Sequence, residues 1–459
     1  MARGSLLAVM SVLDEIVKAY DIRGTFPDQL NAEIARALGV AFARRAGGTT
    51  SAGAILVARD MRPSGPELVD AFIDGVRAQG VDAIELGLAS SDLLYYASGS
   101  RDLPGAIFTA SHNPAEYNGI KFCLAGAKPV DLTEIKEIAD EVLDGRGPAP
   151  ASSPGRRHSE NLLPDFVEHV VSFVDIDKLR PRRVVADTAN GMGGLVVPAV
   201  FERLGVFDLE VMYGELDGTF PNHPADPLQP ANQTDLRARV TAGSFDVGLA
   251  FDGDADRVFV VDETGAGMSG STTTAMLSVA TLRTNPGATI LHNLICSKAV
   301  PEVIREHGGV PIRTRVGHSF IKQRMAETGA VFGGEHSAHY YFARNYGADS
   351  GLIATVQLLG ELTRGEDVLS KVRVPFERYS QSGEINSRVD DVEAVTQRVS
   401  QALSSGKQDN LDGLTVEFPT WWFNLRPSNT EPLLRLNLEA ETRDECDTRV
   451  AELLLLITS

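Results

Sequence analysis

The stretch "VGLAFDGDADRVFVVD", residues 247–262, combines an apolar run, an acidic loop and a second apolar run. Asp252, Asp254 and Asp256 stand at alternate positions of the loop, and carboxylates this close repel one another unless a cation neutralises them. An EF-hand loop is disfavoured because Arg257 stands where that loop needs glycine, and because the flanking runs are typical of strands. The loop predicts a divalent cation site. Mg²⁺ is preferred because it binds few protein carboxylates and shares phosphate oxygens.

This strand and loop end one of three similar cycles along the chain. Each cycle has an apolar strand, a helical stretch, a second short strand, and a third strand that ends in a polar loop. The third strands with their loops are "AIFTASHNP" at 106–114, "VGLAFDGDADR" at 247–257 and "AVFGGEHSAH" at 330–339. Alternating strands and helices favour parallel α/β sheets, and three cycles favour three related domains. Because ligands gather at the carboxyl ends of parallel strands, we expect the three polar loops to face one cleft.

Domain boundaries follow from breaks in this cycle. "DGRGPAPASSPGRR", residues 144–157, is rich in Pro, Gly and Ser and is predicted to be a linker. From about residue 372 the cycle stops, and the remainder indicates a smaller α+β domain. We therefore expect four domains, over residues 1–150, 158–263, 264–371 and 372–459.

Composition narrows the class of partner. The 459 residues include 43 Lys and Arg against 62 Asp and Glu, a net charge of −19, which disfavours nucleic acid. A small anionic substrate then needs a local basic pocket. Cys123, Cys296 and Cys446 lie far apart, which indicates free thiols in the cytoplasm. No apolar run reaches the about 18 residues of a membrane span, and the N-terminal stretch lacks a signal-peptide cleavage site, so we expect translation to start naturally at Met10.

The loop "TASHNP", residues 109–114, is by itself typical of a turn. Ser111 has no G-x-S-x-G elbow, and His112 is its neighbour on an extended segment, where adjacent side chains point in opposite directions. A hydrolase triad is therefore disfavoured, since a serine hydroxyl needs an activating partner. We expect a functional role for Ser111 only if the aspartate loop lies beside it.

Two further loops carry polar groups. In "GEHSAH", residues 334–339, Glu335, Ser337 and His339 suit hydrogen bonds to a polyhydroxyl ligand and acid–base work, and the spacing is not that of a zinc protease. "RPSNTEP", residues 426–432, suits a phosphate; its candidate ligands are Arg426, Ser428, Asn429 and Thr430. An ordinary polar turn remains the alternative for both loops.

Basic residues near these loops supply the expected pocket. Arg23 lies in "KAYDIRG" at 18–24, Lys121 in "NGIK" at 118–121, and His318 with Lys322 in "RVGHSFIK" at 315–322.

Five of these motifs together resemble those of the α-D-phosphohexomutases, in particular the bacterial phosphomannomutase/phosphoglucomutase group. KAYDIRG, TASHNP with NGIK, DGDADR, GEHSAH and RPSNTEP occur in the family's order from residue 18 to residue 432. The resemblance implies four domains around a central cleft. The first three have a related α/β topology with mixed sheets, and the last is a smaller α+β domain.

The resemblance also implies roles for single residues. Ser111 resembles the family's phosphoserine, and Asp252, Asp254 and Asp256 resemble the ligands that hold Mg²⁺ together with the phosphate on Ser111. Glu335, Ser337 and His339 resemble the sugar-selecting loop, and the RPSNT residues resemble a phosphate site. Positions associated with catalysis or substrate contact are Tyr20, Arg23, His112, Lys121, Arg257 and His318.

The implied reaction interconverts hexose 6-phosphate and hexose 1-phosphate through a hexose 1,6-bisphosphate, which also serves as activator. Mannose is the expected sugar and glucose the alternative. His336 and Ala338 replace the Met and Gly of some dual-specificity members, which leaves the preference between the two sugars open. His339 is the expected acid–base group, with Lys121 and Arg23 as rivals.

Other functions remain open at this point. They are a metal-dependent sugar-phosphate phosphatase with an aspartate nucleophile, a Ca²⁺-dependent sugar-binding protein, and a mutase for an amino-sugar phosphate. The oligomeric state is not predicted.

Overall fold

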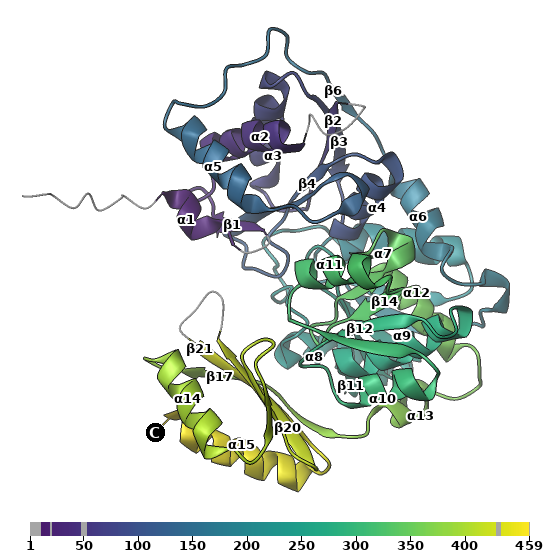
Figure 1. Cartoon of the computed structure of the whole chain (residues 1–459). Coiled ribbons are helices and arrows are strands. Elements are labelled where there is room, and N and C mark those ends of the chain that lie inside the picture. Colours follow the sequence, from purple (N-terminus) through teal and green to yellow (C-terminus); the bar gives the residue numbers. More distant parts are fainter. Residues whose placement is uncertain (1–10, 19–20, 47–52, 428–432, 459) are drawn as a thin grey trace, which may run out of the picture.

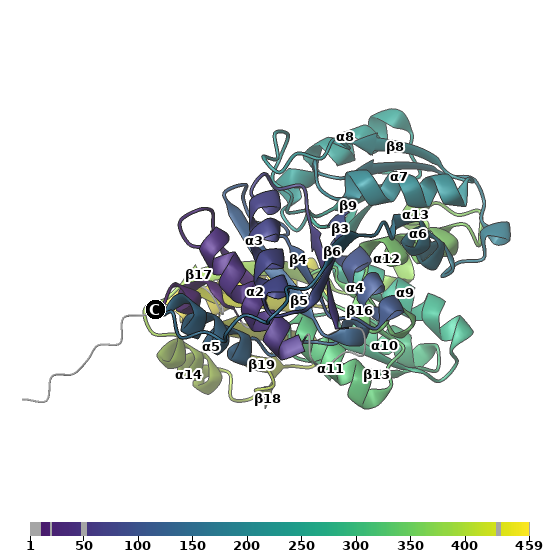
Figure 2. The ribbon, with the colours of Figure 1, turned by 90° about the horizontal axis from the view of Figure 1, so that it is seen from above.

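The computed structural model describes residues 11–18, 21–46, 53–427 and 433–458. Four β-sheets follow one another along the chain, each covered by its connecting helices (Figure 1). In Figure 1 the first sheet lies at the top and the fourth at the lower left. The second and third sheets overlap each other in Figure 1, and they separate in the view from above (Figure 2). Within the described ranges, every helix is too short or too polar to cross a membrane.

The first sheet has the strand order β1-β5-β4-β2-β3-β6. Strand β2 pairs in parallel with β3 and β4, whereas β5 is antiparallel to both β4 and β1. Strand β6 then joins β3 in parallel, so the chain returns to the first sheet at the end of the proline-rich stretch. The strands are β1 (Ile22–Thr25), β2 (Ala54–Arg59), β3 (Asp82–Leu88), β4 (Gly105–Phe108), β5 (Tyr117–Cys123) and β6 (Arg157–Ser159). The helices are α1 (Val12–Ile16), α2 (Ala32–Ala46), α3 (Gly65–Ala78), α4 (Ser91–Arg101) and α5 (Leu132–Leu143).

The second and third sheets repeat this scheme. Their orders are β11-β10-β9-β7-β8 and β13-β12-β14-β15-β16, each with three parallel strands extended by two antiparallel ones. The second sheet comprises β7 (Arg183–Asp187), β8 (Asp208–Met212), β9 (Val247–Phe251), β10 (Val258–Asp262) and β11 (Gly267–Met268), with α6 (Leu163–Val171), α7 (Gly193–Leu204) and α8 (Thr234–Gly243). The third comprises β12 (Thr289–Asn293), β13 (Val310–Thr314), β14 (Phe332–Gly334), β15 (Tyr340–Phe342) and β16 (Ala348–Asp349), with α9 (Gly270–Thr284), α10 (Ala299–Glu306), α11 (His318–Thr328), α12 (Gly351–Leu362) and α13 (Leu369–Val372).

The fourth sheet is entirely antiparallel, in the order β17-β21-β20-β19-β18. Its strands are β17 (Ser380–Arg388), β18 (Lys407–Asp409), β19 (Leu414–Glu417), β20 (Trp421–Pro427) and β21 (Leu433–Ala440). Two helices, α14 (Val392–Ala402) and α15 (Arg443–Thr458), accompany it. Short 3₁₀ helices occur at Ala125–Ala127, Ile176–Lys178, Pro230–Gln233, Ala343–Asn345 and Val374–Phe376. The expected fold, three related α/β units with mixed sheets and a smaller α+β unit, is confirmed.

The strands β4, β9 and β14, at the centre of the three mixed sheets, carry only apolar residues and glycine, as expected for strands buried on both faces. All five residues of β9 are buried, for example. One continuous core joins the first three units, through side chains such as Leu56, Val185, Leu249, Ile290 and Phe332. A separate core around Phe423 and Leu436 fills the fourth unit. The first three units are thus packed as one body, and their loop positions are fixed relative to one another.

The repeated topology places the three polar loops at equivalent points. Each connects the last parallel strand of its sheet to the first antiparallel strand: β4 to β5, β9 to β10, and β14 to β15. The three connections are the TASHNP, DGDADR and GEHSAH loops. As the sequence pattern predicts, each lies at the carboxyl end of a parallel strand.

Candidate active site

Ser111 meets the aspartate loop directly. Its hydroxyl donates a hydrogen bond of 2.8 Å to Asp252 Oδ2, across 141 residues of sequence, and the residue is only 3% exposed. The Ser111 backbone is left-handed, with φ of 48°, and its N–H donates to Thr109 Oγ1 at 2.9 Å. The two loops touch because Gly253 has no side chain: a Cβ there would lie 2.4 Å from the Ser111 carbonyl oxygen. Ser111 therefore lies beside the aspartate loop, which is the condition under which a catalytic role is expected for it.

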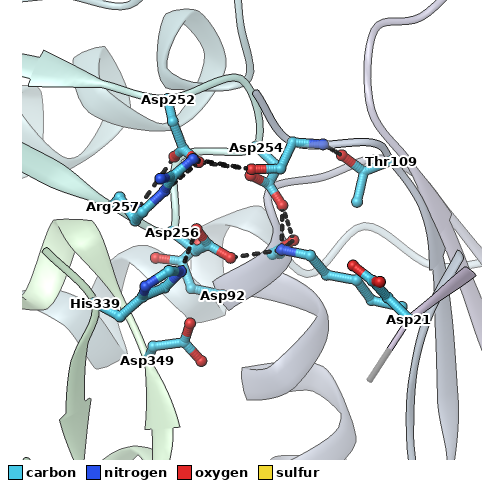
Figure 3. Close-up of polar contacts among 12 residues, drawn as sticks. Asp21, Asp92, Thr109, Asp252, Asp254, Asp256, Arg257, His339 and Asp349 are labelled. Carbon is cyan, nitrogen blue, oxygen red and sulfur yellow. Dashed lines mark hydrogen bonds and ion pairs between the residues drawn. The ribbon is translucent and has the colours of Figure 1, made fainter. Parts of the chain in front are cut away.

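The three aspartates form one buried cluster (Figure 3). Ligand oxygens of Asp252, Asp254 and Asp256 all lie within 4.8 Å of one another. Lys121 Nζ donates to Asp254 Oδ2 at 2.6 Å and to Asp256 Oδ2 at 2.7 Å. The second oxygens of these two carboxylates, both Oδ1, are buried without a hydrogen-bond partner. Two orphaned anionic oxygens beside a third carboxylate fit a hard divalent cation such as Mg²⁺.

The pKa values of the cluster reflect the same crowding. Burial raises the pKa of Asp252 well above its ordinary range, and the charges of Asp254 and Asp256 raise it further. Burial alone would also raise the pKa of Asp254, but the ammonium of Lys121 outweighs it and the pKa falls. For Lys121 itself, burial would lower the pKa, yet Asp254 and Asp256 hold it well above its usual value. Lys121 is therefore a fixed positive charge.

Arg257 links the serine loop to the aspartates. Its Nε donates to Asp252 Oδ2 at 2.8 Å, and its Nη2 donates to His112 Nδ1 at 2.7 Å. The same Nη2 lies 3.4 Å from Ser111 Oγ. Burial, together with the charge of Arg257, holds the pKa of His112 well below its usual range. The ring is therefore neutral, and its Nδ1 is the acceptor in this contact.

The third loop adjoins the second through a backbone bridge between Arg257 and His339. His339 Nε2 lies 3.8 Å from Asp256 Oδ1, and its Nδ1 lies 3.1 Å from Ser337 Oγ. Glu335 is 2% exposed, and its carboxylate already has three donors. They are Tyr341 Oη at 2.7 Å, Asn293 Nδ2 at 3.2 Å and the Gly317 N–H at 3.2 Å. Ser337 and His339 are half-buried, so this loop offers a hydroxyl and an imidazole to a ligand while Glu335 fixes its base.

Of the remaining predicted residues, the structure brings one to the serine loop, places another in the fourth unit and leaves the side chains of the others undescribed. Arg23 donates to Asp21 at 2.8 Å and to Asn113, which brings it to the serine loop. Arg426, in the fourth unit, donates to Glu384 Oε2 at 3.1 Å. His318 begins α11, and its side chain is not described. The predicted residues outside the described ranges are Tyr20, Ser428, Asn429 and Thr430.

Two residues of the site, Ser91 and Asp349, were not among the predicted residues. The Ser91 hydroxyl donates to Asp254 Oδ2 at 2.5 Å from the start of α4, where the preceding Ser90 caps the helix. Asp349 lies with Asp256 and His339 in a second group of close ligand atoms, and Lys322 pairs with it at 2.9 Å. Ser91 follows a strand end in the sequence, as Ser111 does, and that position was the only available hint.

Comparison with known proteins identifies the family. Profiles of the phosphoglucomutase/phosphomannomutase domains match in order: α/β/α domain I at residues 14–146, domain II at 164–266, domain III at 269–379 and the C-terminal domain at 384–456. A protein of Xanthomonas campestris pv. campestris named phosphohexose mutases is 37% identical over 446 residues, 95% of this chain and 97% of that protein. The phosphomannomutase of Escherichia coli K12 is 36% identical over 440 residues, 92% and 94% of the two chains.

The chain belongs to the phosphoglucomutase/phosphomannomutase family. A crystal structure of a family member from Burkholderia thailandensis, at 31% identity, superposes with a TM-score of 0.87 and covers 98% of this chain and 97% of that one. The resemblance carried by the five motifs is confirmed, and the chain is an enzyme, a phosphotransferase of the hexose phosphate mutase class.

Proposed function

We propose that this mutase interconverts mannose 6-phosphate and mannose 1-phosphate through a phosphorylated Ser111, with the glucose phosphates as alternative substrates. The observation that carries the proposal is the 2.8 Å hydrogen bond between Ser111 Oγ and Asp252 Oδ2, which joins a buried hydroxyl to a cluster of carboxylates. The sugar is inferred from relatives named phosphomannomutase.

The aspartate cluster would hold Mg²⁺. Asp252, Asp254 and Asp256 supply the oxygens, and the orphaned Oδ1 atoms of Asp254 and Asp256 are the support for this assignment. The ion would offset negative charge on a phosphoryl group bound to Ser111. Side chains of the protein carry out the remaining steps of the reaction.

Phosphoryl transfer breaks the bond between Ser111 Oγ and phosphorus and forms a bond from phosphorus to a sugar hydroxyl oxygen. Arg257 Nη2, 3.4 Å from Ser111 Oγ, stabilises the leaving serine oxygen, and Lys121 adds a second fixed charge nearby. The hydroxyl proton passes to a base. Lys121 stays charged between Asp254 and Asp256, and an arginine guanidinium does not give up its proton in proteins, so we assign this role to His339.

The product of this step, a hexose 1,6-bisphosphate, must present its other phosphate to Ser111 before it leaves. Ser111 Oγ then binds the phosphorus of that second phosphate, the bond from this phosphorus to its sugar oxygen breaks, and the sugar oxygen takes the proton held by His339, so that the phosphorylated enzyme is restored. Added bisphosphate would phosphorylate idle enzyme and so act as an activator. Arg426 is our candidate for holding the phosphate that is not transferred, because a guanidinium binds phosphate through two parallel hydrogen bonds.

We further propose a cytoplasmic location. Cys123, Cys296 and Cys446 are buried and unpaired. Free buried thiols suit a reducing compartment, where disulfides do not form.

Replacement of Ser111 tests the mechanism. Ser111→Ala should lose mutase turnover by several orders of magnitude in a coupled assay with mannose 1-phosphate or glucose 1-phosphate and added bisphosphate. Ser159→Ala, an exposed serine on β6, is the matched control and should keep wild-type activity. Near-normal turnover of Ser111→Ala would overturn the phosphoserine mechanism. Release of inorganic phosphate without isomerisation would favour a phosphatase.

A further inference from the structure

Arg62 is a fully buried arginine whose guanidinium binds the serine loop. It lies between β2 and α3, has 0% exposure, and is covered by the ring of Phe220 at 5.1 Å. All four of its donated side-chain hydrogen bonds go to backbone carbonyls of the segment 111–117. Nη1 donates to Pro114 O at 2.7 Å and Tyr117 O at 2.8 Å, and Nη2 donates to Asn113 O at 2.7 Å and Ser111 O at 3.0 Å.

A buried charge of this kind needs a counter-charge, and Asp60 provides it. The Asp60 carboxylate is also 0% exposed; it accepts the Arg62 backbone N–H at 2.9 Å and lies 3.3 Å from Arg62 Nε. The Asp60 N–H donates to Phe108 O at 2.9 Å, at the end of β4. The pair is therefore anchored to the strand from which the serine loop departs. A buried ion pair is expensive to maintain, and only arginine offers a planar fork that reaches four carbonyls.

The loop needs such an anchor because its backbone is unusual. Ser111 has φ of 48°, a left-handed conformation that a non-glycine residue adopts only when its surroundings hold it there. That conformation aims Oγ at Asp252. Arg62 binds the carbonyl of Ser111 and those of its neighbours but not the hydroxyl. Its contacts therefore do not depend on whether the hydroxyl carries a phosphoryl group.

We propose that Arg62 is a positioning residue, which fixes the Ser111 loop so that Oγ keeps its alignment with the aspartate cluster in both the phosphorylated and the free enzyme. The proposal rests on the proposed function, in which Ser111 carries the phosphoryl group. It assigns Arg62 an effect on turnover and on the environment of the phosphoserine. Substrate affinity is left to residues of the other loops.

The test is Arg62→Lys in the full-length enzyme, which keeps the charge and removes the fork. Arg36→Lys, an exposed arginine on α2, is the matched control. We expect kcat to fall roughly 100-fold with KM within about threefold of wild type, since a displacement near 1 Å costs that much in rate. ³¹P NMR of the phosphorylated protein should show a single phosphoserine resonance in wild type and Arg36→Lys, and a shifted or broadened one in Arg62→Lys.

Wild-type kcat and an unchanged phosphoserine resonance in Arg62→Lys would overturn the proposal. A lowered kcat with an unchanged resonance would also count against it, because a loss of stability alone would produce that pattern. If Arg62→Lys does not fold, Asp60→Asn, which weakens the anchor and leaves the fork, is measured in the same way. Failure of the proposed function is distinct: it would be activity in Ser111→Ala, whatever the behaviour of Arg62→Lys.

Discussion

Gly253→Ala changes one hydrogen atom to a methyl group at the contact between the serine loop and the aspartate loop. The new Cβ would lie 2.4 Å from the Ser111 carbonyl oxygen, where ordinary contacts begin at 3.4 Å. The oxygen cannot turn away, because it belongs to the backbone and Arg62 Nη2 binds it at 3.0 Å. The two loops must therefore separate by about 1 Å, a displacement comparable to those that cost about 100-fold in rate.

That separation would break the 2.8 Å hydrogen bond between Ser111 Oγ and Asp252 and move the serine away from the cation site. We expect kcat to fall about 100-fold, which corresponds to roughly 2.7 kcal/mol in the activation barrier. The measurement is the coupled mutase assay at saturating bisphosphate, with thermal unfolding to verify folding. Gly365→Ala is the control, since a Cβ there meets only Asp367 N at 3.9 Å.

A Gly253→Ala enzyme with kcat within about threefold of wild type would refute this reasoning, since the expected displacement costs far more. It would mean that the close approach of the two loops does not set the rate. A fall of equal size in Gly365→Ala would refute it as well, because that site has room for the methyl group.

Two other perturbations test the electrostatics. Lys121→Met leaves Asp254 and Asp256 buried without the lysine ammonium, which should destabilise the protein by about 3–5 kcal/mol in EDTA. Mg²⁺ should then raise the melting temperature of Lys121→Met more than that of wild type. An equal rise in the two proteins would contradict a site shared by the lysine and the metal ion. His292, on β12, has a pKa lowered to about 4 by burial, so the unfolded chain takes up its proton first as the pH falls. Stability should be full above the ordinary pKa of about 6.5 and decline toward pH 4, by about 2 kcal/mol between about pH 7.5 and about pH 5. His292→Gln should lose about that much less in denaturant unfolding over the same interval, and an equal loss would remove His292 as the cause.

The sequence predicted the framework of the site because its signals are local. A buried strand between two helical layers must be apolar, and the polar loop after it marks the strand's carboxyl end; "VGLAF" and DGDADR show both features. Three repetitions of that pattern were enough to place Ser111, Asp252 and Glu335 at equivalent points of three sheets. Resemblance to the family then supplied the roles that residue types alone left open.

Other contacts could not be predicted because they join segments that look ordinary by themselves. Arg62 stands in a polar turn and gains its meaning only from carbonyls about 50 residues away. Ser91 opens a helix, and its partner Asp254 is 163 residues distant. The Glu335 carboxylate could have been available to a ligand; that three groups of the protein already bind it follows from tertiary packing.

The Lys121 contacts have a consequence for how the chain assembles. Asp254 and Asp256 belong to the second unit, and the ammonium that pairs with both of them, Lys121, belongs to the first unit. Apart from each other, the second unit would expose carboxylates without this counter-ion, and the first unit would expose an unpaired ammonium. Docking of the first two units therefore neutralises these charges. A divalent ion present during folding would bind the same carboxylates, in competition with the lysine or together with it. Synthesis proceeds from the N-terminus, so the ammonium is made before the carboxylates that it will balance.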